Sequence, residues 1–210
     1  MLHDGDIREP LFDFLEERLG KIRIIEEKTM GRSRADIVMV LPEALAGIEI
    51  KSDADSYARL ARQVEDYDRY FDFNYVVVGS THAAHIREHV PGHWGVISVE
   101  EPEAGGALDF YVIREAARNP FMEPEKKLRL LWRPELAHIQ EKNGMFRYGS
   151  ASKEFVRRKI LECVPQELLW RQFSEELFER DYTTVAQTLE EYRRTHKRTA
   201  RPAKKRRQRR

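Results

Sequence analysis

The segment DIVMVLPEALAGIEIKSD, residues 36–53, is mostly apolar but carries acids and a lysine at defined places. Its two halves read as β-strands, and the PEAL segment between them is typical of a turn. Side chains alternate between the two faces of a strand, so Glu49 and Lys51 share one face while Ile48 and Ile50 occupy the other. The segment therefore predicts a hairpin with one apolar face and one charged face.

The register of this hairpin decides which charges meet. If PEAL forms a four-residue loop, Leu41 pairs with Ala46, and Asp36 then faces Lys51. Opposite and diagonal side chains on neighbouring strands lie roughly 5–8 Å apart. We therefore expect Asp36, Glu49 and Lys51 to converge on one side of the hairpin.

The preceding strand is expected to add a fourth charge. KIRIIEEKT (21–29) is rich in isoleucine, and a two-residue turn in the MGRS segment after it places Glu27 opposite Asp36. Glu27 then joins the charged face. A slip of one residue would move it to the other face, so Glu26 and Glu17 are alternatives for this position.

Crowded carboxylates of this kind need a compensating cation. They repel one another, and burying them costs several kcal/mol when nothing neutralises them. Oxygen ligands suit Mg²⁺ or Mn²⁺, which polarises a phosphoryl oxygen and lowers the pKa of bound water. Phosphodiester hydrolysis is the chemistry that fits, with Asp36, Glu49 and Glu27 as metal ligands and Lys51 orienting the attacking water. The alternative is a surface strand whose lysine forms ordinary ion pairs.

The order of elements predicts an α/β fold. Apolar spacing and turn signals indicate helices at 7–20, 56–71 and 81–90 and strands at 21–29, 34–41, 46–52, 73–80 and 93–100. Antiparallel strands followed by a βαβ crossover imply a mixed sheet with flanking helices.

The C-terminal half has a different pattern. From about residue 121 apolar residues recur three and four positions apart, as in a bundle of helices. We expect an α/β domain at 1–118, a small all-helical domain at 119–192 and a disordered basic tail at 193–210.

The basic tail changes the charge balance of the chain. It contains 11 of the 37 Lys and Arg residues and no acid, so residues 1–192 carry 26 basic against 36 acidic side chains. A polycation of this kind attracts the phosphates of nucleic acids, and its densest run is Lys204, Lys205, Arg206 and Arg207. The alternative is a solvated tail that docks on its own acidic body.

The composition, 41% hydrophobic and 35% charged residues, is that of a soluble globular protein. No apolar run has the length of a membrane span, and the acidic N-terminus does not resemble a signal peptide. We therefore expect a cytoplasmic protein without a membrane partner. The single Cys163 lies in a helical apolar pattern and is expected to be a core thiol, which excludes a disulfide framework and a cysteine-based zinc site.

Several other residues invite a functional interpretation that we do not favour. Four histidines in or near the predicted helix 81–90 lack a cysteine or carboxylate at metal-ligand spacing, which speaks against zinc: His82, His85, His89 and His93. The three tryptophans lie in apolar patterns and are expected in the core: Trp94, Trp132 and Trp170.

The motifs resemble those of a known superfamily. Asp36, a gap and then Glu49-Ile50-Lys51 at a strand end resemble the D…ExK core of the PD-(D/E)XK nucleases, whose restriction-endonuclease-like fold matches the expected element order. Gln63-Val-Glu-Asp-Tyr67 on the next helix resembles the QxxxY element of several branches. The longer run EIKSDADSYARLARQVEDYDRYF, with VVVGSTH, WGVISV and LRLLWRPEL, is similar to a family of uncharacterised bacterial and phage-borne proteins named after a myxobacterial prototype.

This resemblance extends through about residue 180 and implies roles for the matched residues. It implies metal binding by Asp36 and Glu49, action on the attacking water by Lys51, and lining of the site by Gln63 and Tyr67. The sequence departs from the superfamily pattern in one place, where Ala replaces the usual Pro directly before the aspartate.

Nucleic-acid contacts are predicted next to the acids. Arg32 and Arg34 flank the turn before Asp36, where guanidinium groups either hold a phosphate or neutralise nearby acids. Gln63 and Tyr67 lie four residues apart on one helix face. They belong to the site, with Tyr67 contacting nucleic acid, or they pack at its boundary.

Two functions are therefore in competition. The first is a Mg²⁺- or Mn²⁺-dependent nuclease that hydrolyses phosphodiester bonds of DNA, with Asp36, Glu49, Lys51 and Gln63 as its catalytic residues. The second is a catalytically inactive module on the same fold that binds nucleic acid or protein.

Overall fold

The computed structural model describes residues 2–53, 55–102 and 106–180. Met1–Phe178 form one compact unit, and Glu179–Arg210 form a second that lies almost wholly outside the described residues. The predicted basic tail at 193–210 therefore lies outside the described residues, together with Lys204, Lys205, Arg206 and Arg207. No helix in the described part of the chain is both long and apolar enough to cross a membrane.

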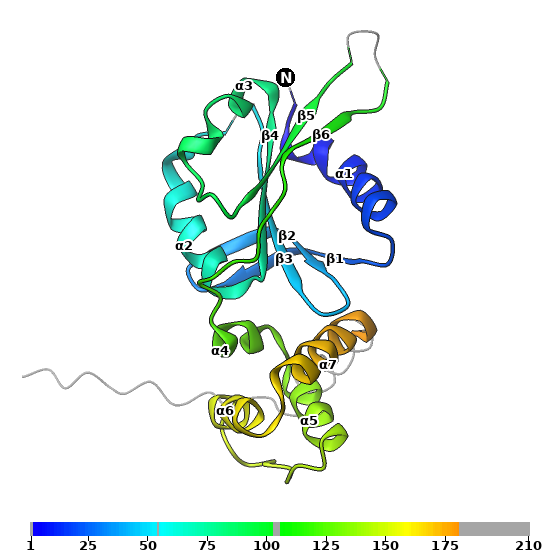
Figure 1. Ribbon diagram of the computed structural model, residues 1–210, viewed down its shortest axis with the longest axis vertical. Helices are drawn as coiled ribbons and strands as arrows, with labels where there is room; N and C mark the ends of the chain where they lie inside the picture. Colours follow the sequence, from blue (N-terminus) through cyan, green and yellow to red (C-terminus); the bar gives the residue numbers. More distant parts are fainter. Residues whose placement is uncertain (1, 54, 103–105, 181–210) are drawn as a thin grey trace, which may run out of the picture. The chain divides into compact units, whose positions relative to one another are not determined.

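A six-stranded mixed sheet forms the centre of the first unit (Figure 1). Its strands follow one another in sequence order: β1 (Arg23–Met30), β2 (Ser33–Val40), β3 (Leu45–Lys51), β4 (Phe73–Gly79), β5 (Gly95–Glu100) and β6 (Asp109–Arg114). β1, β2 and β3 are antiparallel neighbours, β3, β4 and β5 are parallel, and β6 returns antiparallel to β5. The predicted α/β class with a mixed sheet is confirmed.

Helices cover both faces of this sheet. The N-terminal part contributes α1 (Asp4–Leu19), η1 (Tyr57–Arg59), α2 (Leu60–Tyr70), α3 (Ser80–Ala83) and η2 (Ile86–Glu88). Figure 1 shows α1 on one face and α2 on the other. Ile7 and Leu11 of α1 join a buried cluster with Ile37 and Ile48, the apolar face of the predicted hairpin.

Helix α2 approaches β3 closely because Gly47 has no side chain. A Cβ atom at this position would lie 2.3 Å from the ring of Phe71 and 2.6 Å from the ring of Tyr67. The glycine therefore lets both aromatic rings pack closely against the strand. This contact brings the polar end of Tyr67 to the charged face of the hairpin.

The C-terminal helices share a core with the sheet. They are α4 (Pro124–Lys127), η3 (Leu128–Leu130), α5 (Arg133–Lys142), α6 (Lys153–Cys163) and α7 (Gln166–Glu179). Leu128 and Phe173 belong to the same buried cluster as Val76 in β4. Buried Lys127 donates to Asp72 Oδ2 at 2.6 Å. The helical region is confirmed, while the domain boundary at 118 stays a prediction.

Three local expectations were wrong. Val40 pairs with Leu45, two residues away from the predicted register, because Leu41 N donates to Ala44 O at 2.9 Å and closes a two-residue loop in place of the predicted four-residue loop. An even shift keeps every side chain on its predicted face. The helix expected at 81–90 consists only of short α3 and η2, and Cys163 is exposed because it lies at the last turn of α6, on its solvent side.

Candidate active site

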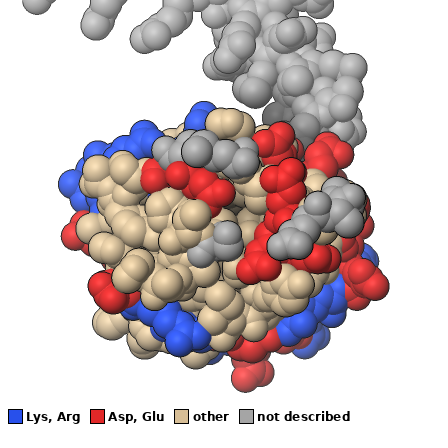
Figure 2. All heavy atoms as spheres, turned by 90° about the horizontal axis from the view of Figure 1, so that it is seen from above, with Lys and Arg blue, Asp and Glu red and all other residues tan. Residues whose placement is uncertain are grey.

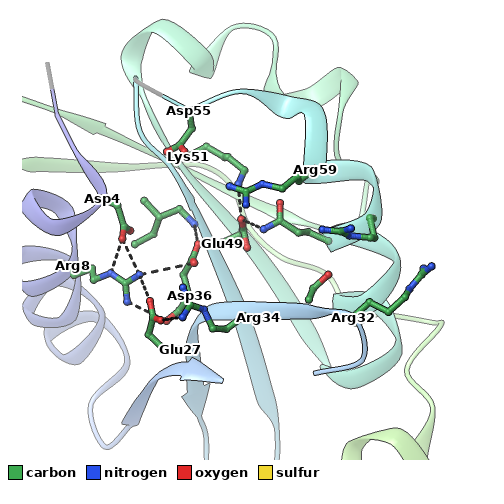
Figure 3. Close-up of a pocket in the computed structure, with 14 residues that line it drawn as sticks. Asp4, Arg8, Glu27, Arg32, Arg34, Asp36, Glu49, Lys51, Asp55 and Arg59 are labelled. Atoms are coloured by element: carbon green, nitrogen blue, oxygen red, sulfur yellow. Dashed lines mark hydrogen bonds and ion pairs between the residues drawn. The ribbon is translucent and has the colours of Figure 1, made fainter. Parts of the chain in front are cut away.

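The three charged residues of the β2–β3 hairpin meet in one cavity of about 360 Å³ (Figure 3). Asp36 comes from β2, and Glu49 and Lys51 come from β3. Glu49 is only 1% exposed, and Lys51 Nζ lies 2.5 Å from its Oε1. Other walls of the cavity come from α1, from β1 and from residues 55–63, which lead into α2 and form its start.

Two side chains of α2 hold the buried Glu49 carboxylate. Gln63 Nε2 donates to Oε1, and the hydroxyl of Tyr67 donates to Oε2 at 2.7 Å. The same hydroxyl accepts from Asp36 N at 3.3 Å, which links the two acidic strands. Burial and the neighbouring carboxylates raise the pKa of Tyr67 well above its usual value. Tyr67 is fully buried, so the prediction that it contacts nucleic acid is replaced by a positioning role.

Asp36 lies in an environment that disfavours its charge. Burial is the largest cause, the charge of Glu49 adds to it, and together they raise the pKa of Asp36 from 3.8 to about 7. Ile50 N donates to Asp36 Oδ2 at 2.9 Å and, with Lys51, partly opposes this rise. A cation between the two carboxylates would relieve the repulsion between them.

Arg8 of α1 is a member of the site that the sequence analysis missed. Its guanidinium bonds Glu26 Oε2 and Glu27 Oε1, each at 3.1 Å, and pairs with Asp4 Oδ2 at 2.8 Å. It also lies 3.9 Å from Asp36 Oδ1. The side chain is 13% exposed, so Arg8 acts as a largely buried counter-ion that fixes α1 against the acidic edge of the sheet.

Glu27 reaches the cavity, as predicted, but other side chains hold its carboxylate. One oxygen accepts from Arg8 and the other pairs with Arg34. Glu27 has φ of +56°, the only positive value for a non-glycine residue in the described part of the chain. A left-handed glutamate is strained, and strain of this kind persists where the surrounding contacts require it. The two alternatives to Glu27 do not line the cavity. Glu26 pairs with Arg8, and Glu17 is an exposed residue of α1.

Exposed arginines surround the mouth of the cavity. Arg32 and Arg34 come from the β1–β2 turn and β2, as predicted, while Arg59 and Arg62 come from η1 and α2. Arg59 lies four residues before Gln63, a spacing that predicts one helix face, so the same pattern that found the glutamine could have found it. The rim therefore carries four arginines from two parts of the chain, of which Arg32 pairs with Glu65 and Arg34 with Glu27.

Asp66 of α2 fixes the turn that carries Arg32. Its Oδ2 accepts from Ser33 Oγ at 2.6 Å and from Arg32 N at 3.2 Å. Gly31 has φ of +54°, and a Cβ atom there would lie 2.5 Å from Asp66 Oδ1. The turn therefore needs glycine both for its backbone conformation and for this contact.

The donor set of the cavity fits a metal ion held by two carboxylates. Across residues 2–53, 55–102 and 106–180, no group of three Asp, Glu, His or Cys side chains is arranged to hold a metal. Mg²⁺, however, is often bound by one or two carboxylates, with water and substrate phosphate completing its shell. Asp36 and Glu49 supply such a pair. A carboxylate oxygen has about two acceptor positions, so Glu49 Oε2 keeps one beyond its bond from Tyr67.

Trp94 and Trp170 are buried in the core, as expected, whereas Trp132 is only half-buried.

Comparison with known proteins identifies a phage family. The family model described as Bacteriophage P4 protein cII matches residues 2–204, so the chain belongs to this family. Among curated proteins, none matches the sequence. The solved structure of Pyrococcus furiosus SfsA in complex with Ca²⁺ is similar over 54% of this chain, with 16% identity and a TM-score of 0.32. The chain spans 60% of that structure, and a likeness this weak carries no functional argument.

Proposed function

We propose that this member of the P4 cII family is a metal-dependent nuclease that hydrolyses phosphodiester bonds, with DNA as the expected substrate. The observation that carries the proposal is the convergence of Asp36, Glu49 and Lys51 in one polar cavity. Two neighbouring carboxylates can hold the metal ion of metal-assisted phosphoryl hydrolysis, and an ammonium group beside them can stabilise the developing charge. The membership of the chain in the PD-(D/E)XK superfamily is part of this proposal, and rests on the D…ExK and QxxxY patterns.

Each side chain has a defined task in the proposed reaction. Mg²⁺ or Mn²⁺ held by Asp36 and Glu49 would polarise the scissile phosphate and lower the pKa of the attacking water. Lys51 orients that water and stabilises the charge that develops on the phosphoryl oxygens. Gln63 fixes Glu49 through its amide nitrogen, while its Oε1 is buried without a hydrogen-bond partner among the described residues.

The arginine rim supplies contacts to the phosphates on either side of the scissile bond. Arg32 and Arg34 come from the β1–β2 turn and β2, and Arg59 and Arg62 from η1 and α2. Guanidinium groups bind phosphate bidentately, which fixes the position of a strand without reading its sequence. The four arginines are therefore expected to hold a strand over the carboxylate pair.

The tail is proposed to provide long-range attraction, because the rest of the chain is acidic. Figure 2 shows one face of the first unit, on which acidic side chains gather along one side, uncharged surface fills the middle and basic side chains lie at the margins. A surface of this kind repels DNA at a distance. Lys204, Lys205, Arg206 and Arg207 would offset that repulsion through contacts with phosphates.

One observation favours the second candidate, a binding module without catalysis. Lys51 is engaged with Glu49 in a closed, buried ion pair, and a third carboxylate ligand is missing from the described part of the site. A module of this kind would bind nucleic acid through the arginine rim but would not respond to Mg²⁺.

The experiment that separates the two candidates measures cleavage and metal binding together. Linear, nicked and branched DNA are incubated with the full chain with and without Mg²⁺, alongside Lys51→Ala, and Mg²⁺ binding is measured by calorimetry. We expect Mg²⁺-dependent cleavage that Lys51→Ala abolishes, while this variant still binds the ion. DNA binding with neither cleavage nor a heat of Mg²⁺ binding would establish the binding module instead.

A further inference from the structure

The loop between α5 and α6 displays an aromatic side chain to solvent. Phe146 is 74% exposed, the largest exposure among the large hydrophobic residues in the described chain. Its ring makes an edge contact with Tyr148 at 5.2 Å, and Tyr148 makes an edge contact with Phe155 at 5.1 Å. Three rings thus form a row that runs from solvent to the surface of α6.

This loop is held firmly in place. The guanidinium group of Arg133 donates to the carbonyl oxygens of Tyr148 and Gly149 at 2.7 Å and of Ala151 at 2.6 Å. Gln140 Nε2 donates to the carbonyl oxygen of Phe146 at 2.8 Å. An exposed ring on a restrained backbone loses little conformational freedom on binding, so the loop is suited to contact a ligand.

The surroundings of the loop are basic, although the body of the protein is acidic. Residues 144–160 contain five Lys or Arg and one Glu, whereas residues 1–192 carry 26 basic against 36 acidic side chains. Of the five, Arg157 is buried, and Arg158 and Lys159 pair with Glu162, while Arg147 and Lys153 are exposed. The guanidinium group of Arg158 lies 5.4 Å from the ring centre of Phe155. Arg147 and Tyr148 also line a cavity of about 240 Å³. Rings and cations side by side are complementary to a strand with flat bases and charged phosphates.

We infer that the α5–α6 loop is a stacking platform for single-stranded nucleic acid. Phe146 stacks on an unpaired base, Tyr148 supports the ring through its edge contact, and Arg147 and Arg158 contact the adjoining phosphates. Stacking of this kind accepts any base because every base has a π-face. The platform needs no metal and none of the proposed catalytic residues, so it goes beyond the proposed nuclease function and is independent of it.

Anisotropy of labelled oligonucleotides tests the platform. The full chain is titrated, in EDTA to prevent cleavage and at raised salt to weaken binding by the tail, into a single strand, a duplex of equal length and a single strand of abasic sites. We expect Phe146→Ala to weaken binding of the normal single strand about fivefold or more. The duplex and the abasic strand should be unaffected, because neither offers an unpaired base.

Matched variants separate stacking from other causes. Phe146→Trp should restore the affinity, and Phe121→Ala, which removes another exposed ring (62% exposed) outside the loop, should leave it unchanged. Equal affinity of Phe146→Ala and wild type for the single strand would overturn the inference, as would an equal loss on the abasic strand. A smaller oligomer of Phe146→Ala by light scattering would identify the ring as a contact between copies of the chain and would also overturn it.

Discussion

Replacing Asp36 with Asn should stabilise the metal-free protein at neutral and alkaline pH. The pKa of Asp36 is raised from 3.8 to about 7, first by burial and then by the charge of Glu49. Each pKa unit corresponds to about 1.4 kcal/mol. The ionised Asp36 therefore destabilises the folded protein by roughly 4 kcal/mol as an upper bound. Asparagine keeps an oxygen that can accept from Ile50 N and carries no charge. We therefore expect a gain of about 2–4 kcal/mol in the free energy of unfolding at pH 8.

The sign of this effect fixes its pH window. Below about pH 4 the Asp36 carboxyl is protonated in both the folded and the unfolded chain, so it does not lower the free energy of unfolding of the wild type. Between about pH 4 and pH 7 the unfolded chain ionises first, and the folded wild type is progressively destabilised. The advantage of Asp36→Asn should therefore be absent near pH 4, grow across this window and level off above about pH 7.

Urea unfolding followed by tryptophan fluorescence measures this difference at several pH values. Asp109→Asn is the control, because Asp109 lies exposed on β6, unlike Asp36. Adding Mg²⁺ at pH 8 should stabilise the wild type but not Asp36→Asn, since the ion would bind the paired carboxylates. A difference between Asp36→Asn and wild type that does not change with pH, or a less stable variant at pH 8, would refute the reasoning.

Three further predictions concern the site and the tail. Tyr67→Phe removes a buried donor from Glu49, so we expect a loss of about 1–3 kcal/mol in the free energy of unfolding together with slower cleavage; unchanged stability would show that the bond contributes nothing. Replacing both Arg59 and Arg62 with Gln should raise KM far more than it lowers kcat and should reduce the salt slope of DNA binding by about 1.8; an unchanged slope would remove both from the phosphate contacts. Deleting 193–210 should weaken DNA binding and flatten its salt dependence, and binding curves that superpose at every salt concentration would assign the tail another role.

Much of the fold could be predicted because the relevant signals are local. The two-residue turn before Ser33 was predicted correctly, since Met30 pairs with Ser33. Face alternation placed Glu49 and Lys51 together whatever the register of the hairpin, because an even shift does not change the face. The loop itself was misjudged by two residues, since a turn composition does not say which residue closes the hydrogen bond. The helix predicted from residue 81 breaks up because it has only Ile86 and Val90 to bury.

The remaining part of the site depends on contacts between distant segments. Arg8 lies 28 residues before Asp36, and the sequence around it shows only an amphipathic helix. Arg8 lies beside the acids because α1 packs on the sheet through the buried cluster that contains Ile7 and Leu11. The strained backbone of Glu27 likewise has no signal in a single sequence, because a glutamate in the left-handed region is exceptional.

The same face of helix α2 packs against the sheet and contributes side chains to the site. Tyr67 packs over Gly47 through its ring and bonds Glu49 through its hydroxyl, while Asp66 fixes the turn that carries Arg32. Substitutions of these α2 residues should therefore change stability and activity together. Arg59 and Arg62 are exposed and share no core contact, so their substitution should change substrate binding alone. A variant of Asp66 with full stability but weakened DNA binding would separate the turn from the core and show that the two roles of α2 are independent.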